Sequence, residues 1–600
     1  MLVPAHARPG PGRRPTTRDA PVARRRTGGS PVTATVTGEG TATDPGAVRT
    51  TAEVLAEAVQ AQGCSHVFGL MGDGNMHFLI ALAHRGVDVV EVRHESAAVA
   101  MAEGFGWSSG RVGICSVTHG PGLTHTATSL VVAARNRSPL VLLVAETPTG
   151  YQGAQRYDQE AFVAACEAPY RRLAPGEDPA AVLAEVFASA RAASRPVVLA
   201  VPADLLTNPA AAGTGSATPA HDRPATAPAA SGSAAAAQSL LDALIQAERP
   251  VLIAGRGAMA GRTRTFATAI ADQLGVGLAT TLPAKGLFDG HPLDLGIAGG
   301  LSHPAAERLL READLVVAVG ASMGRSTTQS QRLFKGARVV QVAREAMEDG
   351  AGPGAEVIVG DAEPTLAALV DLLDVQGTAR APWFTPPGSS PECWQEDLSD
   401  FAPDVPEGTV DPRRALSAID AAIPSDAVVI VSNGHCSGFV SAFVSTPRDG
   451  QWHTAQGFGS IGQALTSAIG AACGAPERKV VVFEGDAAFM MHAQEVETAA
   501  RAGVDLTVFV LNDQALGTEY QRLLMEGDDA HLAVVAPPDL AAVGQAFGAR
   551  GWTIDGREPA DVAERALQPG LSVVEVRTAR SVLSRHMRLR PAGRDGGGAK

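Results

Sequence analysis

The sequence has few aromatic residues, no excess of positive charge and no long apolar run. Aromatic residues make up 4% of the 600 residues, and the formal net charge is −14 at pH 7. Proteins that bind nucleic acid or an anionic membrane need basic stripes or patches, so neither partner is expected. No segment approaches the roughly 18 apolar residues of a membrane-spanning helix, so no membrane association is expected either.

Paired cysteine motifs are also absent. None of the six cysteines has the CxxC spacing of a zinc site or a redox motif. Most lie among small or apolar residues, which is typical of free thiols in a reducing compartment. We therefore expect a cytoplasmic protein without a zinc site.

Segments poor in apolar residues divide the chain. The first 48 residues are rich in Arg, Pro, Gly and Thr and lack the apolar core of a signal peptide, so they predict a disordered tail. Two further stretches, 207–236 and 376–412, have the composition of linkers. The predicted domains are residues 49–206, 237–375 and 413–582, followed by a basic flexible tail at 583–600.

Each of the three predicted domains alternates apolar runs with helical stretches. Examples are "PLVLLVAE", "RPVLIAG" and "AVVIVSNG". This alternation predicts three α/β domains with largely parallel sheets.

The stretch "GDAAFMMHAQEVETAARAGVDLTVFVLND" places one aspartate after each of two predicted strands. The predicted strands are 479–483 and 506–511, with a helix at 494–502 between them. Parallel strands bring Asp486 and Asp513 to the same carboxyl edge, where α/β folds bind ligands. Two neighbouring carboxylates repel one another unless a cation lies between them, although aspartate is equally common in ordinary turns.

A second acidic residue begins a helix of small and apolar residues. Glu95 lies in the first turn of a predicted helix, 96–102, that is apolar on nearly every side and therefore buried. A carboxylate at this place is stabilised by the helix dipole, but its burial is costly without a hydrogen-bond partner. An exposed capping role is the alternative. Glycine-rich turns, one holding Asp73 and one formed by "HGPG", follow two other predicted strands.

Together these motifs resemble the thiamine diphosphate-dependent enzyme superfamily, in the branch of acetolactate synthase, pyruvate decarboxylase and benzoylformate decarboxylase. The resemblance covers residues 50–580. It rests on the aspartate stretch and on motifs in the order of the family: "VFGLMGDGN", "HESAAVAMAEGFG", "HGPG", "RPVLIAGRGA", "TTLPAKGLFDGHPLDLG" and "GFGSIGQALTSAIGAA". It implies pyrimidine-binding, Rossmann-like middle and diphosphate-binding domains.

The resemblance implies an Mg²⁺ site that bridges the protein to the diphosphate. Asp486 and Asp513 match the two metal-ligand positions, and the carbonyl of Ala515 is the third contact. Asn512 is the alternative if the register differs by one residue. Gly485 and Ala487 flank the first ligand, with Ala487 standing where the family more often has glycine.

Other positions match the remaining cofactor contacts of the family. Glu95 matches the glutamate that hydrogen-bonds the pyrimidine ring and promotes loss of the thiazolium proton. Ile461 matches the apolar residue beneath the bent cofactor, and the carbonyl of Gly459 is expected to accept from its amino group. His435 is a weaker candidate near the diphosphate.

The reaction implied is attack on a 2-oxo acid, loss of carbon dioxide and then protonation or ligation to an aldehyde or 2-oxo acid acceptor. Gln159 favours carboligation as in acetolactate synthase. Asp73 and Glu519 favour decarboxylation with aldehyde release, and Thr518 departs from the acetolactate synthase pattern. His119 is a further candidate catalytic group, with a surface turn residue as the equal alternative.

Several alternatives remain open from the sequence. A non-decarboxylating synthase or lyase resembling carboxyethylarginine synthase uses the same cofactor. "GRGAMAG" in the middle segment leaves FAD undecided and also permits an NAD(P)-dependent oxidoreductase. A noncatalytic subunit fits poorly with a buried Glu95. The resemblance further implies a homodimer, or a homotetramer, with Glu95 and the diphosphate motif of each site on different subunits.

Overall fold

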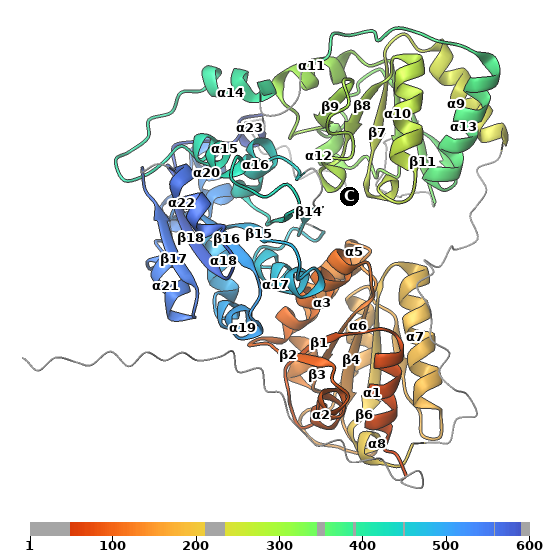
Figure 1. The fold of residues 1–600 in the computed structure, drawn as a ribbon, viewed down its shortest axis with the longest axis vertical. Helices are drawn as coiled ribbons and strands as arrows, with labels where there is room; N and C mark the ends of the chain where they lie inside the picture. Colours follow the sequence, from red (N-terminus) through yellow and green to blue (C-terminus); the bar gives the residue numbers. More distant parts are fainter. Residues whose placement is uncertain are drawn as a thin grey trace, which may run out of the picture. The chain divides into compact units, whose positions relative to one another are not determined.

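The computed structural model describes residues 48–210, 234–344, 355–387, 392–447, 451–455, 457–556 and 559–589. The predicted N-terminal tail and most of the first predicted linker lie outside these residues. The described part contains three six-stranded sheets, and the strands within each sheet pair in parallel (Figure 1). The predicted α/β fold with parallel sheets is confirmed.

The N-terminal sheet has the strand order β2-β1-β3-β4-β6-β5. Its central strands are continuous runs of buried aliphatic residues, as expected when helices cover both faces. One core lies between the sheet and helices α1, α2 and α7, and another lies on the face that carries α3 and α5. The strands are β1 (His66–Gly69), β2 (Asp88–Glu91), β3 (Gly113–Val117), β4 (Leu140–Glu146), β5 (Tyr170–Arg172) and β6 (Pro196–Pro202). The helices are α1 (Thr51–Ala61), α2 (Met76–His84), α3 (Glu95–Ser109), α4 (Pro121–Thr124), α5 (Ala127–Arg135), α6 (Gln159–Ala165), α7 (Pro179–Ala193) and α8 (Ala203–Thr207).

The C-terminal sheet repeats this topology. Its order, β14-β13-β15-β16-β18-β17, has the same pattern of neighbours as the N-terminal sheet. The strands are β13 (Val428–Val431), β14 (Gln451–Thr454), β15 (Val480–Gly485), β16 (Leu506–Asn512), β17 (Arg550–Ile554) and β18 (Ser572–Arg577). The helices are α15 (Pro412–Asp420), α16 (His435–Phe443), α17 (Ala464–Gly474), α18 (Asp486–His492), α19 (Glu495–Ala502), α20 (Gly517–Glu526), α21 (Leu540–Ala546), α22 (Pro559–Ala566) and α23 (Arg585–Arg588). In both sheets the chain changes direction between the second and third strands of the order, so a crevice is expected at that edge.

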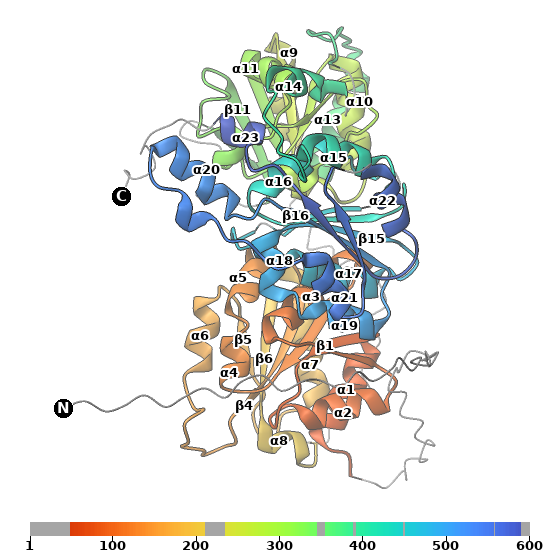
Figure 2. The ribbon, with the colours of Figure 1, turned by 90° about the vertical axis from the view of Figure 1, so that its left-hand side faces the viewer.

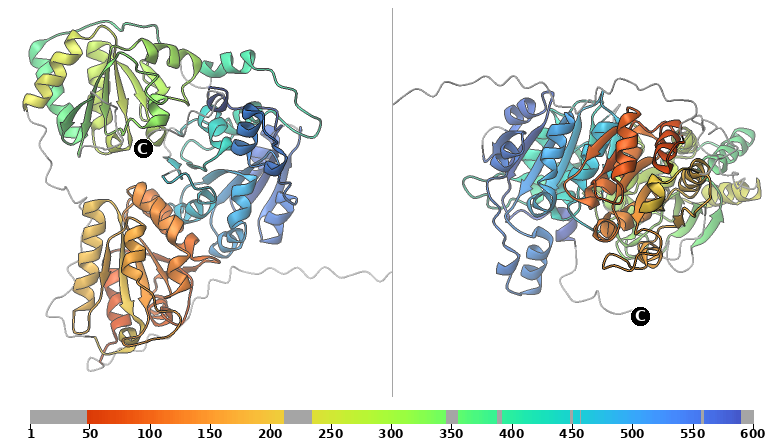
Figure 3. Two further views of the ribbon diagram at one scale, coloured as in Figure 1. Left: turned by 180° about the vertical axis from the view of Figure 1, so that it is seen from behind. Right: turned by 90° about the horizontal axis from the view of Figure 1, so that it is seen from below.

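The middle sheet has a different order, β12-β11-β10-β7-β8-β9, which is that of dinucleotide-binding folds. Helices lie on both faces of this sheet (Figure 3). One core forms against α9, α10 and α13, and a second core forms on the face that carries α11. The strands are β7 (Pro250–Ala254), β8 (Gly277–Thr280), β9 (Asp294–Ile297), β10 (Leu315–Val319), β11 (Arg338–Ala343) and β12 (Glu356–Val359). The helices are α9 (Ala234–Gln246), α10 (Thr263–Leu274), α11 (Pro304–Glu312), α12 (Arg325–Thr328) and α13 (Ala362–Gln376).

Helices α3 and α17 pack closely side by side, and they join the N-terminal and C-terminal sheets into one core (Figure 2). Both helices are rich in small residues, which allows their backbones to approach. A Cβ atom added to Gly104 of α3 would lie 1.9 Å from the carbonyl oxygen of Ser467 in α17. Gly470 of α17 is equally close to the carbonyl of Met101. This packing explains why the sequence of α3 is apolar on nearly every side.

Two segments predicted to be irregular carry structure. The predicted linker 376–412 includes α14 (Gln395–Asp400), and the predicted flexible tail from residue 583 begins with α23. Met587 of α23 is buried, and Arg585 forms an ion pair of 2.6 Å with Glu307 of the middle domain. Arg585 and Arg588, the two arginines of this segment that the structure describes, therefore both form ion pairs, Arg588 with Asp397.

The six cysteines are free, and five of them are buried. This confirms the prediction of free thiols. Among the described residues, no helix has both the length and the apolar character that a membrane span requires.

Candidate functional site

A cavity lies at the carboxyl edge of the C-terminal sheet, where loops after β13, β15 and β16 meet. The loop after β13 contributes Asn433 and His435, and the loop after β15 contributes Asp486. Asp513 and Ala515 line it from the loop after β16. The sequence prediction that the two aspartates emerge at one edge is confirmed.

Asp486 is the first residue of α18 and is almost completely buried. Its Oδ1 accepts a hydrogen bond of 2.8 Å from the backbone N–H of Ala487, whereas its Oδ2 has no hydrogen-bond partner. Burial, reinforced by the charge of Asp513, raises the pKa of the Asp486 carboxyl to about 7. A buried carboxylate with an unpaired oxygen beside a second carboxylate favours binding of a cation.

The structure distinguishes between the two candidates for the second metal ligand, Asp513 and Asn512. The side-chain amide of Asn512 donates a 2.6 Å hydrogen bond to Glu575, and Asn512 does not line this cavity. Asp513 lines it, and its Oδ1 accepts from the N–H of Ala515 at 3.1 Å. Gln514 between them has a φ of 58°, a left-handed turn that directs the chain back from the end of β16. The geometry favours Asp513 over Asn512.

His435 begins α16 and faces the same cavity. Its Nε2 accepts a 3.1 Å hydrogen bond from the N–H of Ser584, so the proton belongs on Nδ1, which lies 3.8 Å from Oδ2 of Asp513. The preceding Gly434 has a φ of 96°, which only glycine adopts readily. The segment before α23 therefore helps to orient His435.

The remaining predicted residues of the C-terminal domain surround this cavity. Gly485, Ala487, Ile461 and Glu519 line it, and Thr518 lies beside Glu519 in α20. Gly459, with a φ of 80°, lines an adjoining cavity that Ile461 and Glu519 also line. The structure thus brings every predicted residue of this domain except Asn512 to two connected cavities.

Glu484 is a residue that the sequence reasoning missed. It precedes the Gly-Asp pair, is fully buried, and burial raises the pKa of its carboxyl to about 7. Its Oε1 accepts a hydrogen bond of 3.3 Å from the hydroxyl of Ser432, whereas its Oε2 has no hydrogen-bond partner. Glu484 therefore links β15 to the start of the loop after β13. In the sequence, only its position beside Gly485 and Asp486 could have marked Glu484 as a site residue.

The predicted residues of the N-terminal domain do not line these cavities in the described chain. Glu95 begins α3, as predicted, and its side chain is 12% exposed. Its Oε2 lies 2.9 Å from Nδ1 of His125, a partner that the sequence reasoning did not identify. His125 stands three residues after the Gly-Pro-Gly turn, which was the available signal.

Asp73 and His119 meet at the edge of the N-terminal sheet. Nε2 of His119 lies 3.9 Å from Oδ1 of Asp73 and 3.0 Å from the side-chain oxygen of Gln155. The His119 ring is buried, and its Nδ1 has no partner, so His119 is no surface turn residue. Gln159 is buried at the start of α6 and donates to the carbonyl of Ala145 at 3.2 Å.

Three family models match the chain in the order of its domains. Residues 49–166 match the N-terminal thiamine pyrophosphate-binding domain, 237–369 the central domain and 432–576 the C-terminal thiamine pyrophosphate-binding domain of thiamine pyrophosphate enzymes. These matches favour a thiamine enzyme over the NAD(P)-dependent alternative, and they provide no support for FAD.

Several proteins are similar to this chain along most of their length. A probable 2-ketoarginine decarboxylase of Pseudomonas aeruginosa is 30% identical, over 88% of this chain and 94% of that protein. A sulfoacetaldehyde acetyltransferase of Alcaligenes xylosoxydans xylosoxydans is 26% identical, over 84% and 88%. An acetolactate synthase of Mycobacterium avium is 28% identical, over 85% and 84%. Because three family models match in domain order and a relative is 30% identical over most of both chains, the chain belongs to the thiamine pyrophosphate enzyme family.

Proposed function

We propose that this protein is a thiamine diphosphate- and Mg²⁺-dependent enzyme that decarboxylates a 2-oxo acid and joins the remaining fragment to an aldehyde or 2-oxo acid acceptor. The observation that supports it most directly is the unpartnered, buried Oδ2 of Asp486 in a cavity that Asp513 also lines. The free cysteines fit a reducing compartment such as the cytoplasm.

Asp486, Asp513 and the carbonyl of Ala515 form the proposed Mg²⁺ site. All three lie at the cavity and offer the hard oxygen ligands that Mg²⁺ prefers. An Mg²⁺ ion there relieves the repulsion between the carboxylates and attracts the diphosphate. Bound thiamine diphosphate supplies an electron sink that accepts the electron pair released when the carboxyl group leaves.

Residues of this chain position the remaining parts of the cofactor and move a proton. Ile461 offers an apolar surface at the cavity, and Gly459 offers a backbone carbonyl at the adjoining one. With the cofactor bound, the Glu95 carboxyl would hold the proton that it shares with the pyrimidine nitrogen. Glu484 links β15 to the start of the loop after β13.

The site is completed by a second copy of the chain, so the functional unit is at least a homodimer. The support is that Glu95 does not line the cavity of Asp486 within the described residues. A second subunit supplies Glu95, together with Asp73 and His119, to the cavity of the first. Gln159 is held in place by the hydrogen bond from its amide nitrogen to the carbonyl of Ala145.

Simple decarboxylation is the second candidate, and Glu519 favours it. This exposed carboxyl lines both connected cavities, where it is placed to deliver a proton to the reaction intermediate. The similar 2-ketoarginine decarboxylase fits this reaction, whereas the acetyltransferase and the acetolactate synthase fit transfer or ligation. A non-decarboxylating synthase is the third candidate, and no contact among the described residues favours it.

The test is mass spectrometry of the products formed from pyruvate and larger 2-oxo acids, with thiamine diphosphate and Mg²⁺, with and without aldehydes. A hydroxyketone or acetohydroxy acid supports carboligation. Aldehyde and carbon dioxide alone support the decarboxylase alternative, and product that retains the carboxyl carbon of the donor contradicts both.

Glu519→Gln separates the first two reactions further. If Glu519 donates the proton, the variant forms aldehyde about 100-fold more slowly while ligation changes far less. Equal losses in both reactions would contradict that role. Glu526→Gln, in the same helix, is the matched control because it lies outside both cavities.

A further inference from the structure

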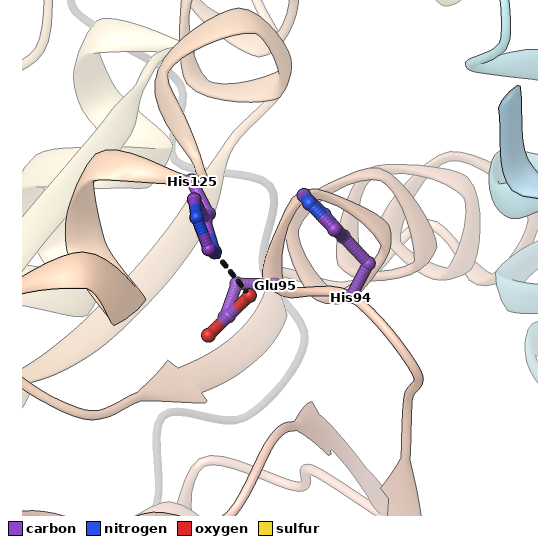
Figure 4. Close-up of side chains that lie close together, drawn as sticks. All are labelled: His94, Glu95 and His125. Carbon is purple, nitrogen blue, oxygen red and sulfur yellow. Dashed lines mark hydrogen bonds and ion pairs between the residues drawn. The ribbon is translucent and has the colours of Figure 1, made fainter. Parts of the chain in front are cut away.

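Glu95 has a half-exposed imidazole as its direct neighbour. Glu95 begins α3 after strand β2, and His125 follows the short helix α4 after strand β3 (Figure 4). Nδ1 of His125 lies 2.9 Å from Oε2 of Glu95. The Glu95 side chain is 12% exposed, whereas that of His125 is 51% exposed. His125 is therefore the member of this pair that reaches the solvent.

The hydrogen bond between the two side chains fixes where the proton lies. A carboxylate accepts, so Nδ1 of His125 carries the proton and donates it to Oε2 of Glu95. Nε2 of the neutral imidazole is then an acceptor. Within the part of the chain that the structure describes, Nε2 of His125 and Oε1 of Glu95 have no hydrogen-bond partner. The pair thus keeps one atom for the solvent and one for a ligand.

The neighbouring His94 supports the ring of His125. The two rings are stacked, with centroids 5.0 Å apart and an angle of 24° between their planes. Nδ1 of His94 accepts the backbone N–H of Ser96 at 3.2 Å, so the proton of His94 belongs on Nε2. The Ser96 hydroxyl lies 2.7 Å from that nitrogen and 2.9 Å from Nε2 of the buried His492. His94 is thus fixed by its own contacts.

We propose that His125 acts through Glu95 as a proton relay, which carries protons between the Glu95 carboxyl and the solvent. A proton from water or buffer binds Nε2 of His125, and the resulting imidazolium gives its Nδ1 proton to Oε2 of Glu95. The imidazole is then neutral with its proton on Nε2, and the Glu95 carboxyl is protonated. The reverse steps return a proton to the solvent. Histidine is the side chain best suited to shuttle protons near neutral pH.

This inference rests on the proposed function, in which Glu95 holds the proton that it shares with the pyrimidine nitrogen of the cofactor. A relay lets a carboxyl that is only 12% exposed gain and lose its proton in every turnover. His125 needs no contact with the substrate for this role, so its effect is on proton exchange and not on substrate binding.

The experiment measures how fast the C2 hydrogen of bound thiamine diphosphate exchanges with D2O, by rapid quenching and proton NMR, in the full-length protein with Mg²⁺. His125→Asn keeps an amide N–H that can donate to Glu95 but cannot relay a proton. The exchange rate is expected to fall at least about tenfold in this variant, whereas the affinity for thiamine diphosphate changes less than about threefold. His84→Asn, at an exposed histidine of α2, is the matched control and should exchange like the wild type.

Chemical rescue separates a proton relay from a structural role. His125→Ala should also exchange slowly, and added imidazole should restore at least about half of the wild-type rate while leaving the wild type unchanged. A structural defect does not respond to imidazole. An unchanged exchange rate in His125→Asn overturns the proposal, as does a failure of imidazole to rescue a folded His125→Ala variant that binds the cofactor.

Glu95→Gln distinguishes this proposal from the proposed function. Slow exchange in Glu95→Gln together with normal exchange in His125→Asn leaves the role of Glu95 standing and removes the relay. Normal exchange in Glu95→Gln contradicts both, as does a wild type that binds no thiamine diphosphate.

A second readout needs no cofactor. Nitrogen NMR of the histidine-labelled protein should show a signal that disappears in His125→Asn, with the chemical shifts of an imidazole that carries its proton on Nδ1. Shifts of the opposite tautomer would contradict the proposed route of the proton.

Discussion

The N-terminal and C-terminal domains share one strand order, but their key carboxyl groups differ in burial and in hydrogen-bond partners. Asp486 is buried with an unpartnered oxygen, and a second carboxylate lies nearby. Glu95 is nearly as well covered, but it has a hydrogen-bond partner in His125. Topology places both carboxyls at a carboxyl edge, whereas the neighbouring side chains decide which one requires an external cation.

This difference also explains the two ligand chemistries. The C-terminal edge is built of carboxylates and backbone carbonyls, which suit a hard cation and a diphosphate. The N-terminal edge is built of carboxyls and imidazoles, which suit proton transfer. Duplication of the sheet topology thus provides two places for a site, and the loops give each place its own function.

The largest expected effect is on turnover in Glu95→Gln. The amide retains the shape of the side chain but cannot exchange the proton, so kcat should fall about 100- to 10,000-fold. Steady-state kinetics at saturating thiamine diphosphate measures it, with circular dichroism to show that the fold is kept. Activity near that of the wild type would remove the functional distinction between the two carboxyls.

Asp486→Asn should have opposite effects without and with the cofactor. Removal of one buried negative charge should stabilise the metal-free protein at pH 8 by about 1–2 kcal/mol, a rise of a few degrees in Tm. The same variant should lose most of the Tm increase that Mg²⁺ and thiamine diphosphate give the wild type. Differential scanning calorimetry measures both values.

The pH dependence provides the control for this prediction. The folded-state pKa of Asp486 is raised to about 7 from an ordinary value of 3.8, so its contribution to stability is present at low pH and is lost as pH rises through that interval. The gain in Asp486→Asn should therefore vanish near pH 4. Glu95→Gln, whose carboxyl is paired, should show no comparable gain at pH 8, and an equal gain would contradict the comparison.

The packing of α3 on α17 couples the two domains, and Gly470→Ala should weaken it. The added Cβ would lie 1.9 Å from a backbone carbonyl, so the helices have to move apart. We expect a loss of about 1–3 kcal/mol in the free energy of unfolding. Urea denaturation measures it, and Gly324→Ala is the matched control.

Gly324 of the middle domain has a φ of −66° and no atom closer than 4.0 Å to the position of an added Cβ. Its substitution should change stability by less than about 0.5 kcal/mol. Equal effects at Gly324 and Gly470 would mean that the close approach of α3 and α17 is not a stabilising contact.

The last prediction concerns acid destabilisation through His453. This buried histidine packs against Trp107 of α3 at a centroid distance of 4.6 Å, and burial lowers the pKa of its imidazole to about 3. The unfolded chain binds the proton near pH 6.5, so stability should fall by up to about 1.4 kcal/mol per pH unit as pH decreases below that value.

His453→Phe keeps an aromatic ring and removes the proton. The variant should lose less Tm than the wild type between pH 6.5 and pH 4, while His492, whose pKa burial lowers to about 4, continues to contribute. If Tm falls equally with pH in the two proteins, His453 does not cause the acid destabilisation.

The sequence by itself determined the three α/β domains, the order of their motifs and the two aspartates at one edge. These features depend on local patterns, because a run of Val and Ile defines a buried strand and parallel strands bring their ends together. Glu95 at the start of α3 was predictable for the same reason. Helix α18 and the ordered start of the C-terminal segment were not, because they depend on contacts with distant parts of the chain.

Only the tertiary structure decided which side chains meet. It assigned Asn512 to Glu575 and left Asp513 at the cavity, although the two residues are adjacent in sequence. It also paired Glu95 with His125, thirty residues away, and paired Glu484 with Ser432. The physical reason is that burial and hydrogen-bond partners depend on packing between elements, which the local pattern of a sequence does not encode.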